Sequence, residues 1–146
     1  MPCKILKIYE PPENTQELSR IPLGCPVPAG WPSPAEDYIQ GELNLHEHFV
    51  KNTAASYLVE VVGDSMIGAG IHDGDVMVVN RSKTPHSGNV VVAIIDGEPT
   101  IKRFIIDKKS GRKLLVPENP NYSTIDVTGR EDAMIWGVAT SVHHNL

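Results

Sequence analysis

The sequence predicts a mainly β protein, a twisted and partly closed antiparallel sheet assembly that carries an extended N-terminal arm. Aromatic residues make up only 5% of the chain, so Val, Ile and Leu must fill the interior, and β-branched residues favour strands. Short β-branched runs recur from residue 57 onward and are separated by turn signals, as expected for an antiparallel sheet. Eight of the twelve prolines fall within the first 34 residues, which indicates an arm.

The arm should be extended over Pro22 to Pro34 and resemble polyproline. Proline fixes φ and lacks a backbone N–H, so this segment is not expected in the interior of a sheet. It can, however, lie in a cleft. We therefore divide the chain into a flexible arm, residues 1–29, and a β domain, residues 30–146.

A short helix should begin after the arm, because Asn44-Leu45-His46-Glu47 is a capping box. This helix should run to about Val50. The rest of the chain should form strands. Seven β-branched runs predict them: Tyr57–Val62, Val76–Asn80, Asn89–Asp96, Thr100–Asp107, Leu114–Val116, Ser123–Val127 and Met134–Val142. Glycine- or proline-containing turns divide these runs.

Composition excludes several classes of protein. The 146 residues suit one domain, and the formal charge of −5 argues against a general nucleic-acid surface. Cys3 and Cys25 are the only cysteines, so a reducing compartment without disulfides is the simpler expectation. No apolar run approaches the roughly 20 residues that cross a bilayer, and the segment from Met1 to Lys7 lacks a signal-peptide core. A cytoplasmic protein without a cofactor is expected.

Ser65 and Lys102 are candidates for a nucleophile and its general base. A serine hydroxyl needs an adjacent base, and a lysine amine serves only when it is neutral. Burial can lower a lysine pKa by up to about 3 to 5 units, although strand alternation alone does not bury Lys102, because Arg103 occupies the opposite face. The backbone N–H groups of Asp64 and Ser65 could hold the developing oxyanion. Taken singly, a turn serine and a solvated strand lysine remain the ordinary interpretations.

Several motifs together resemble the LexA and UmuD family of self-cleaving serine peptidases (peptidase family S24), most closely its UmuD-like branch. The resemblance covers nearly everything from Gly30 onward and depends on four segments: residues 30–38, Gly63-Asp64-Ser65-Met66, Asp73-Gly74-Asp75 and residues 96–103. It implies a LexA C-terminal-like, signal-peptidase-like fold. It also implies that Ser65 is the nucleophile, that Lys102 is the general base, and that the bond between Ala29 and Gly30 is cleaved.

The family resemblance implies a role in the SOS response as well. A UmuD-like protein loses its arm when RecA filaments on single-stranded DNA stimulate cleavage. Its processed homodimer then joins a UmuC-like Y-family polymerase in error-prone translesion synthesis. Only 29 residues precede the expected cut, too few for the helix-turn-helix domain of a repressor, so direct sequence-specific DNA binding is not expected.

Two rival functions remain. A signal-peptidase-like enzyme would also use serine and lysine, but it would need a membrane anchor, which this sequence lacks. A noncatalytic polymerase-binding module would retain Ser65 and Lys102 only as relics. An intact chain after prolonged incubation would favour that second alternative.

Other clusters have weaker functional interpretations. His46 and His48, or His143 and His144, lack companion ligands at a recognised spacing, so no metal site is predicted and the second pair is expected in a frayed tail. Asp73-Gly74-Asp75 lacks the remaining ligands of a calcium loop and should be a turn. A basic hairpin tip consists of Lys108, Lys109, Arg112 and Lys113. It could touch DNA or a partner, although a solvated turn is the simpler interpretation.

Overall fold

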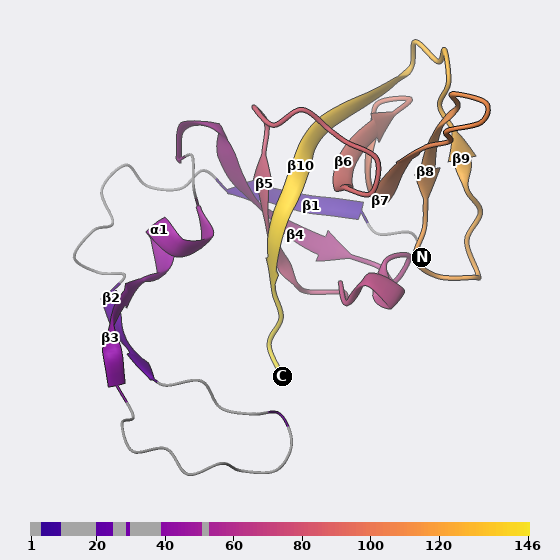
Figure 1. Ribbon diagram of the computed structural model, residues 1–146. Coiled ribbons are helices and arrows are strands. Elements are labelled where there is room, and N and C mark those ends of the chain that lie inside the picture. Colours follow the sequence, from indigo (N-terminus) through magenta and orange to yellow (C-terminus); the bar gives the residue numbers. More distant parts are fainter. Residues whose placement is uncertain (1–3, 10–19, 25–28, 30–38, 51–52) are drawn as a thin grey trace. The chain divides into compact units, whose positions relative to one another are not determined.

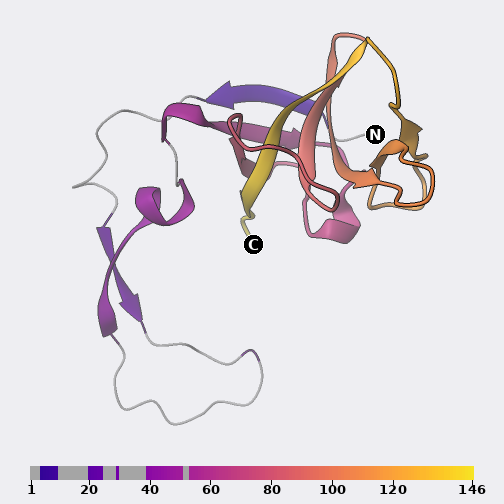
Figure 2. The same ribbon diagram turned by 45° about the horizontal axis from the view of Figure 1, so that its top comes forward.

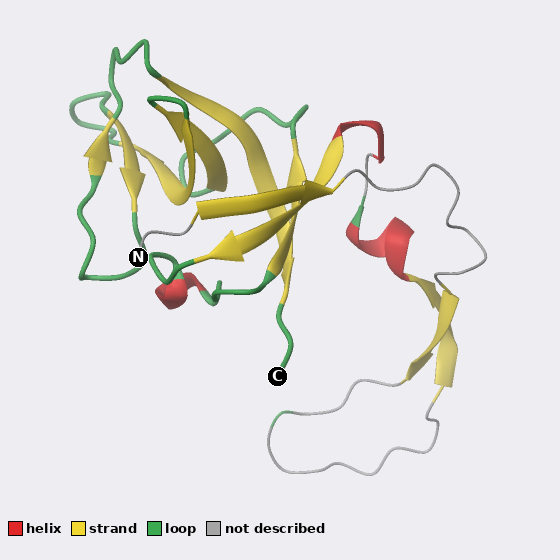
Figure 3. Cartoon of the chain, turned by 180° about the vertical axis from the view of Figure 1, so that it is seen from behind, coloured by secondary structure: helices red, strands yellow, loops and turns green. Residues whose placement is uncertain are grey.

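The computed structural model describes residues 4–9, 20–24, 29, 39–50 and 53–146. The chain forms two units: a larger one made of Met1–Pro11 and Asn52–Leu146, and a smaller one made of Pro12–Lys51. Strands dominate the described residues, which confirms the predicted mainly β class (Figure 3). No helix among the described residues is long and apolar enough to cross a membrane.

The larger unit contains one antiparallel sheet of eight strands, in the order β1-β4-β5-β10-β6-β7-β8-β9 (Figure 1). All seven strands that the β-branched runs predict are present. The bounds are β1 Lys4–Tyr9, β4 Ser56–Val62, β5 Val76–Asn80, β6 Val90–Ile95, β7 Glu98–Ile106, β8 Lys113–Val116, β9 Ile125–Asp126 and β10 Ala133–His143. Strand β1, which pairs with β4, is an addition to the prediction.

Strand β10 holds the two halves of this sheet together. Its C-terminal half pairs with β5 and its N-terminal half pairs with β6, so it crosses the middle of the sheet in both views (Figures 1 and 2). The register shifts between Ile135 and Gly137 and again between Ala139 and Ser141. Such bulges increase strand twist and bending, which allows one long strand to serve both halves.

Two apolar clusters pack against the sheet because side chains alternate along each strand. One joins β4 and β5 to Met66 and Ile71 of the intervening loop, and it includes Ile101 of β7. The other contains Phe104 of β7 together with residues of β6, β8 and β10. Strand β7 therefore contributes to both clusters and is covered on both faces.

The smaller unit has a two-stranded sheet, β2 Arg20–Gly24 and β3 Ile39–Asn44, followed by helix α1 Leu45–Phe49. The predicted cap is present, because the side chain of Asn44 accepts a 3.2 Å hydrogen bond from the N–H of Glu47. Pro22 lies in β2 opposite Glu42. A two-stranded sheet has only edges, where the missing N–H of proline is tolerated.

The N-terminal region thus contains strands where the proline content predicts only an extended arm. The unit boundaries, near residues 11 and 51, do not coincide with residue 29. The predicted division at residue 29 marks the bond that is expected to be cleaved, which a division of the folded chain into units does not test. It therefore remains a prediction. Pro26, Pro28, Pro32 and Pro34 of the predicted polyproline-like segment lie outside the described residues.

Candidate functional site

Ser65 lies in the loop that joins β4 to the short 3₁₀ helix η2, Ile67–Ala69. Gly63 begins this loop with a φ of 92°, in the left-handed region that favours glycine. Its N–H donates a 2.7 Å hydrogen bond to Oδ1 of Asp73. This turn ends β4 and directs the chain inward, and the side chain of Ser65 is completely buried.

Lys102 lies in the middle of β7 and is only 3% exposed. Its Nζ atom is 3.0 Å from Oγ of Ser65, 2.9 Å from Oγ1 of Thr100 and 3.1 Å from the carbonyl oxygen of Ile101. Thr100 shares a strand face with Lys102, as alternation predicts. Two hydroxyls and a carbonyl oxygen thus lie within hydrogen-bonding distance of the amine. The structure brings together the two residues that the sequence selected.

The loop that carries Ser65 is anchored to the segment after β8. The N–H of Glu118 donates to the carbonyl oxygen of Ser65 at 2.8 Å, and the N–H of Gly68 donates to the carbonyl oxygen of Glu118 at 2.8 Å. A Cβ atom at Gly68 would lie 2.6 Å from that same oxygen. Only glycine allows this close approach, so the position of Ser65 depends on a backbone contact with residue 118.

Asp64 provides a second anchor for the same loop. The side chain of Asn119 donates a 3.0 Å hydrogen bond to the carbonyl oxygen of Asp64, and the hydroxyl of Tyr122 donates to Oδ1 of Asp64 at 2.5 Å. The bond from Tyr122 is the main reason why the pKa of Asp64 lies below its ordinary value. Sequence reasoning missed Asn119 and Tyr122, because it treated Asn119-Pro120 only as a turn signal.

A cavity of about 270 Å³ adjoins the amine. Lys102, Thr100 and Tyr122 line it, together with Pro99 and Ser123. Ser65 is completely buried and is not among the residues that line this cavity. The amine of Lys102 is therefore next to both the serine hydroxyl and an open space.

The remaining predicted residues of the reaction are placed only in part. Ala29 is exposed and lies in a bend of the smaller unit. Gly30 lies outside the described residues. The predicted cleavage of the bond between them, and the oxyanion role of the N–H groups of Asp64 and Ser65, remain predictions.

The basic hairpin tip is an exposed turn between β7 and β8. The side chain of Asp107 accepts hydrogen bonds from the N–H of Lys109 and the hydroxyl of Ser110, and Arg112 pairs with Asp126. Two carboxylates thus offset part of its positive charge. This observation favours the solvated-turn interpretation.

The histidines are arranged differently from the prediction. The prediction that His143 and His144 lie in a frayed tail is wrong: His143 is the last residue of β10 and lies opposite Val76, and His144 contacts Asp75. Asp75 lies in the predicted turn and is buried. His46 and His48 lie on α1 in the smaller unit. Among the described residues, one group has the donors and spacing for a metal ion, namely His72, Asp75 and His144.

Comparisons with known proteins agree with this architecture. Residues 22–140 match the Peptidase S24-like family. Protein SamA of Salmonella typhimurium is 40% identical over 134 residues, which are 91% of this chain and 91% of that protein. Protein MucA of Escherichia coli is 44% identical over 115 residues, 78% of this chain and 77% of that protein.

A LexA repressor gives a further match. The protein from Clostridium perfringens is 37% identical over 140 residues, which are 96% of this chain and 66% of the repressor. The residues that match the family include both Ser65 and Lys102. The chain belongs to the Peptidase S24-like family, as the motifs around these two residues predicted.

Proposed function

We propose that this protein is a self-cleaving serine peptidase of SOS mutagenesis, with Ser65 as nucleophile, Lys102 as general base and the bond between Ala29 and Gly30 as substrate. The observation that carries the proposal is the 3.0 Å separation of Ser65 Oγ and Lys102 Nζ in a buried site. A buried lysine is costly for stability, and a catalytic role explains its presence.

A neutral amine at Lys102 fits the three contacts that the structure shows. It has two N–H groups, which can donate to Thr100 Oγ1 and the carbonyl oxygen of Ile101, and one lone pair, which can accept the proton of Ser65. Burial disfavours the charged ammonium form. Thr100 and Ile101 therefore orient the lone pair toward the serine hydroxyl.

In the first half of the reaction, Lys102 takes the hydroxyl proton while Ser65 Oγ attacks the carbonyl carbon of Ala29. The resulting ammonium group then gives a proton to the nitrogen of Gly30 as the amide bond breaks. The break frees the amino group of Gly30, and residues 1–29 remain as an ester on Ser65. In the second half, water attacks the ester with Lys102 again as base, which releases the arm as a carboxylic acid and restores the serine.

The small side chains at the substrate bond suit the cavity beside Lys102. Ala29 and Gly30 present little bulk, and the neighbouring cavity of about 270 Å³ is bordered by Pro99 and Tyr122. An exposed bend at Ala29 also makes its carbonyl group accessible to a nucleophile. The substrate is therefore this chain's own arm, cleaved within one subunit or between two.

Processing should produce a homodimer that acts as accessory subunit of a UmuC-like translesion polymerase, with RecA filaments on single-stranded DNA as the stimulus. Similarity over 91% of both this chain and Protein SamA supports a UmuD-like role over that of a free-standing protease. The formal charge of −5 supports action through protein partners, since phosphate binding needs clustered cations.

Mass spectrometry of the full chain tests the peptidase. During incubation at alkaline pH, or with RecA filaments, we expect fragments 1–29 and 30–146, formed faster as pH rises because more of the amine is neutral. Ser65→Ala and Lys102→Ala should each abolish both fragments. Ser110→Ala, which alters an exposed serine, and Lys113→Ala, which alters an exposed lysine, should leave them unchanged.

A chain that stays intact under both conditions would contradict the peptidase. The polymerase partnership has a separate test, in which the wild-type chain and Ser65→Ala are each coexpressed with a UmuC-like polymerase. Copurification of the processed wild-type chain supports the partnership. Cleavage without copurification of either form would contradict the partnership while leaving the peptidase in place.

A further inference from the structure

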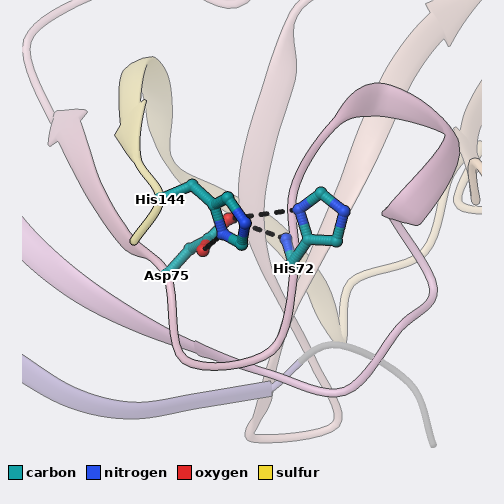
Figure 4. Close-up of side chains that lie close together, drawn as sticks. All are labelled: His72, Asp75 and His144. Carbon is teal, nitrogen blue, oxygen red and sulfur yellow. Dashed lines mark hydrogen bonds and ion pairs between the residues drawn. The ribbon is translucent and has the colours of Figure 1, made fainter. Parts of the chain in front are cut away.

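We propose that His72, Asp75 and His144 form a binding site for one divalent transition-metal ion, with Zn²⁺ as the best match. Two imidazoles and one carboxylate are the ligand types that zinc accepts. Their ligand atoms all lie within 4.8 Å of one another. Figure 4 shows the three side chains close together, with dashed lines for their hydrogen bonds and ion pairs.

The carboxylate is the fixed member of the site. Asp75 is only 2% exposed, and its Oδ2 atom accepts a 2.7 Å hydrogen bond from the N–H of His72. Its backbone carbonyl accepts from the N–H of Val61 at 2.8 Å. A turn thus holds one ligand in place just before β5, and it brings the ring of His72 to the same place.

The two imidazoles approach this carboxylate from different parts of the chain. His144 Nδ1 is 2.5 Å from Asp75 Oδ1, and His72 Nδ1 is 3.7 Å from Asp75 Oδ2. The rings of His72 and His144 lie 4.4 Å apart between centroids, with an angle of 32° between their planes. His144 directly follows β10, so the sheet topology creates this group.

The hydrogen bonds within the cluster do not account for all of its polar atoms. The N–H of His72 and the ring of His144 contact the two oxygens of Asp75. The Nδ1 atom of His72, however, is buried and has no hydrogen-bond partner among the described residues. A buried polar atom without a partner is unfavourable. A metal ion bound by the ligand atoms of the three residues would give this nitrogen a ligand bond and would balance the carboxylate.

The distances between ligand atoms need small adjustments, and the two rings must also turn, because imidazole binds a metal in the plane of its ring and these planes lie only 32° apart. Zinc binds nitrogen and oxygen at about 2.0 to 2.2 Å, so tetrahedral ligands are separated by about 3.3 Å. The observed 2.5 Å and 3.7 Å separations lie on either side of that value. The side chains of His144 and His72 are 43% and 40% exposed, which gives them room to move and leaves solvent access to a fourth ligand position.

The ligand types also select the metal. Mg²⁺ and Ca²⁺ prefer sites made of oxygen, whereas imidazole with carboxylate suits Zn²⁺, Ni²⁺ and Cu²⁺. A bound ion would tie the end of β10 to the loop that precedes β5, in the same unit as Ser65. It would stabilise the folded chain in proportion to the logarithm of its free concentration.

Isothermal titration of the full chain, free of affinity tags and with Cys3 and Cys25 changed to Ser, tests the site. We expect one equivalent of Zn²⁺ to bind and to raise the unfolding temperature, with no such effect from Mg²⁺. His144→Ala and His72→Ala should each lower the affinity for Zn²⁺ by at least about tenfold. Even the loss of a group that only supports a metal ligand lowers metal affinity by about 10- to 100-fold. Co²⁺ should give the intense visible absorption of a low-coordinate site, and these variants should reduce it.

Two controls make the result specific. His143→Ala alters the neighbouring histidine, which contacts Asn145, and the double variant His46→Ala/His48→Ala removes the pair on α1. Both should bind Zn²⁺ like the starting protein. The proposal is overturned if Zn²⁺ does not bind, if His144→Ala and His72→Ala bind it unchanged, or if only the His46 and His48 variant loses it.

Discussion

The hydroxyl of Tyr122 donates a 2.5 Å hydrogen bond to Oδ1 of Asp64, the residue that precedes Ser65. Tyr122 also borders the cavity beside Lys102. One side chain therefore touches both the loop of the serine and the space available to a substrate. This contact can be removed by deleting a single oxygen atom.

Tyr122→Phe should raise the pKa of Asp64 toward its ordinary value of 3.8, because the hydrogen bond from Tyr122 is the largest influence that lowers it. A lowered pKa contributes stability above the ordinary value and loses it as pH falls through the folded value. The variant should therefore show a weaker loss of stability in acid. NMR titration of the Asp64 carboxyl measures the shift.

The same variant should slow self-cleavage severalfold, because the loop of Ser65 loses one anchor. Tyr57→Phe is the matched control, since Tyr57 packs its ring on Trp136. It should leave the Asp64 titration unchanged. An unchanged Asp64 titration in Tyr122→Phe would mean that the hydrogen bond does not persist in solution.

Gly68→Ala should destabilise the protein by about 1 to 3 kcal/mol, the usual cost of overpacking, because its Cβ would lie 2.6 Å from a backbone oxygen of Glu118. It should also slow self-cleavage, since Glu118 holds the carbonyl group of Ser65. Urea unfolding and mass spectrometry measure the two effects.

Gly70→Ala provides the comparison for Gly68→Ala. Gly70 has a φ of 77°, and no atom lies within 4 Å of the position that a Cβ would take, so alanine there adds backbone strain without a clash. The expected cost is about 1 to 2 kcal/mol, with cleavage close to the wild-type rate at a temperature where both variants are folded. If Gly68→Ala cleaved itself at the wild-type rate, the contact with Glu118 would have no role in positioning Ser65.

Asp126→Asn should reduce the sensitivity of the protein to acid. Hydrogen bonds from Thr128, with a contribution from Arg112, lower the pKa of Asp126 from 3.8 to about 2. The stability that this carboxylate contributes is complete above pH 3.8 and is lost as pH falls toward 2. Acid titration followed by circular dichroism should show a smaller loss across this window in the variant.

Glu131→Gln, which neutralises an exposed carboxylate in the loop between β9 and β10, serves as the control for Asp126→Asn. Its acid unfolding curve should follow that of the wild-type protein. Equal curves for Asp126→Asn and the wild-type protein would contradict the contribution of Asp126.

The sequence predicts strand positions well here, because local alternation and turn residues determine them. Strand β1 escaped prediction because the neighbouring Pro11 and Pro12 suggested an irregular arm, whereas pairing with β4 stabilises Lys4–Tyr9 as a strand. Strand alternation also could not predict whether Lys102 is buried. Lys102 is buried because apolar clusters cover both faces of β7.

The site could be predicted only where residue type alone suggests chemistry. Ser65 and Lys102 are such residues, and the family resemblance paired them across 37 positions. Asn119 and Tyr122 contact Asp64 across 55 and 58 positions, and His144 contacts Asp75 across 69. Nothing in the local sequence signals these contacts, because the order of strands in the sheet creates them.

Thr100→Val should slow self-cleavage by about threefold to tenfold, as expected when a net hydrogen bond of roughly 0.5 to 1.5 kcal/mol is lost from the transition state. Valine keeps the shape of threonine but removes the oxygen that accepts a 2.9 Å hydrogen bond from Lys102 Nζ. The amine then loses one of the two groups that direct its lone pair toward Ser65. Thr100→Ser restores that oxygen and should recover most of the rate, while Thr84→Val, at an exposed threonine, should have no effect. Equal rates for Thr100→Val and the wild-type chain, measured as fragment 30–146 over time, would show that Thr100 does not orient the base.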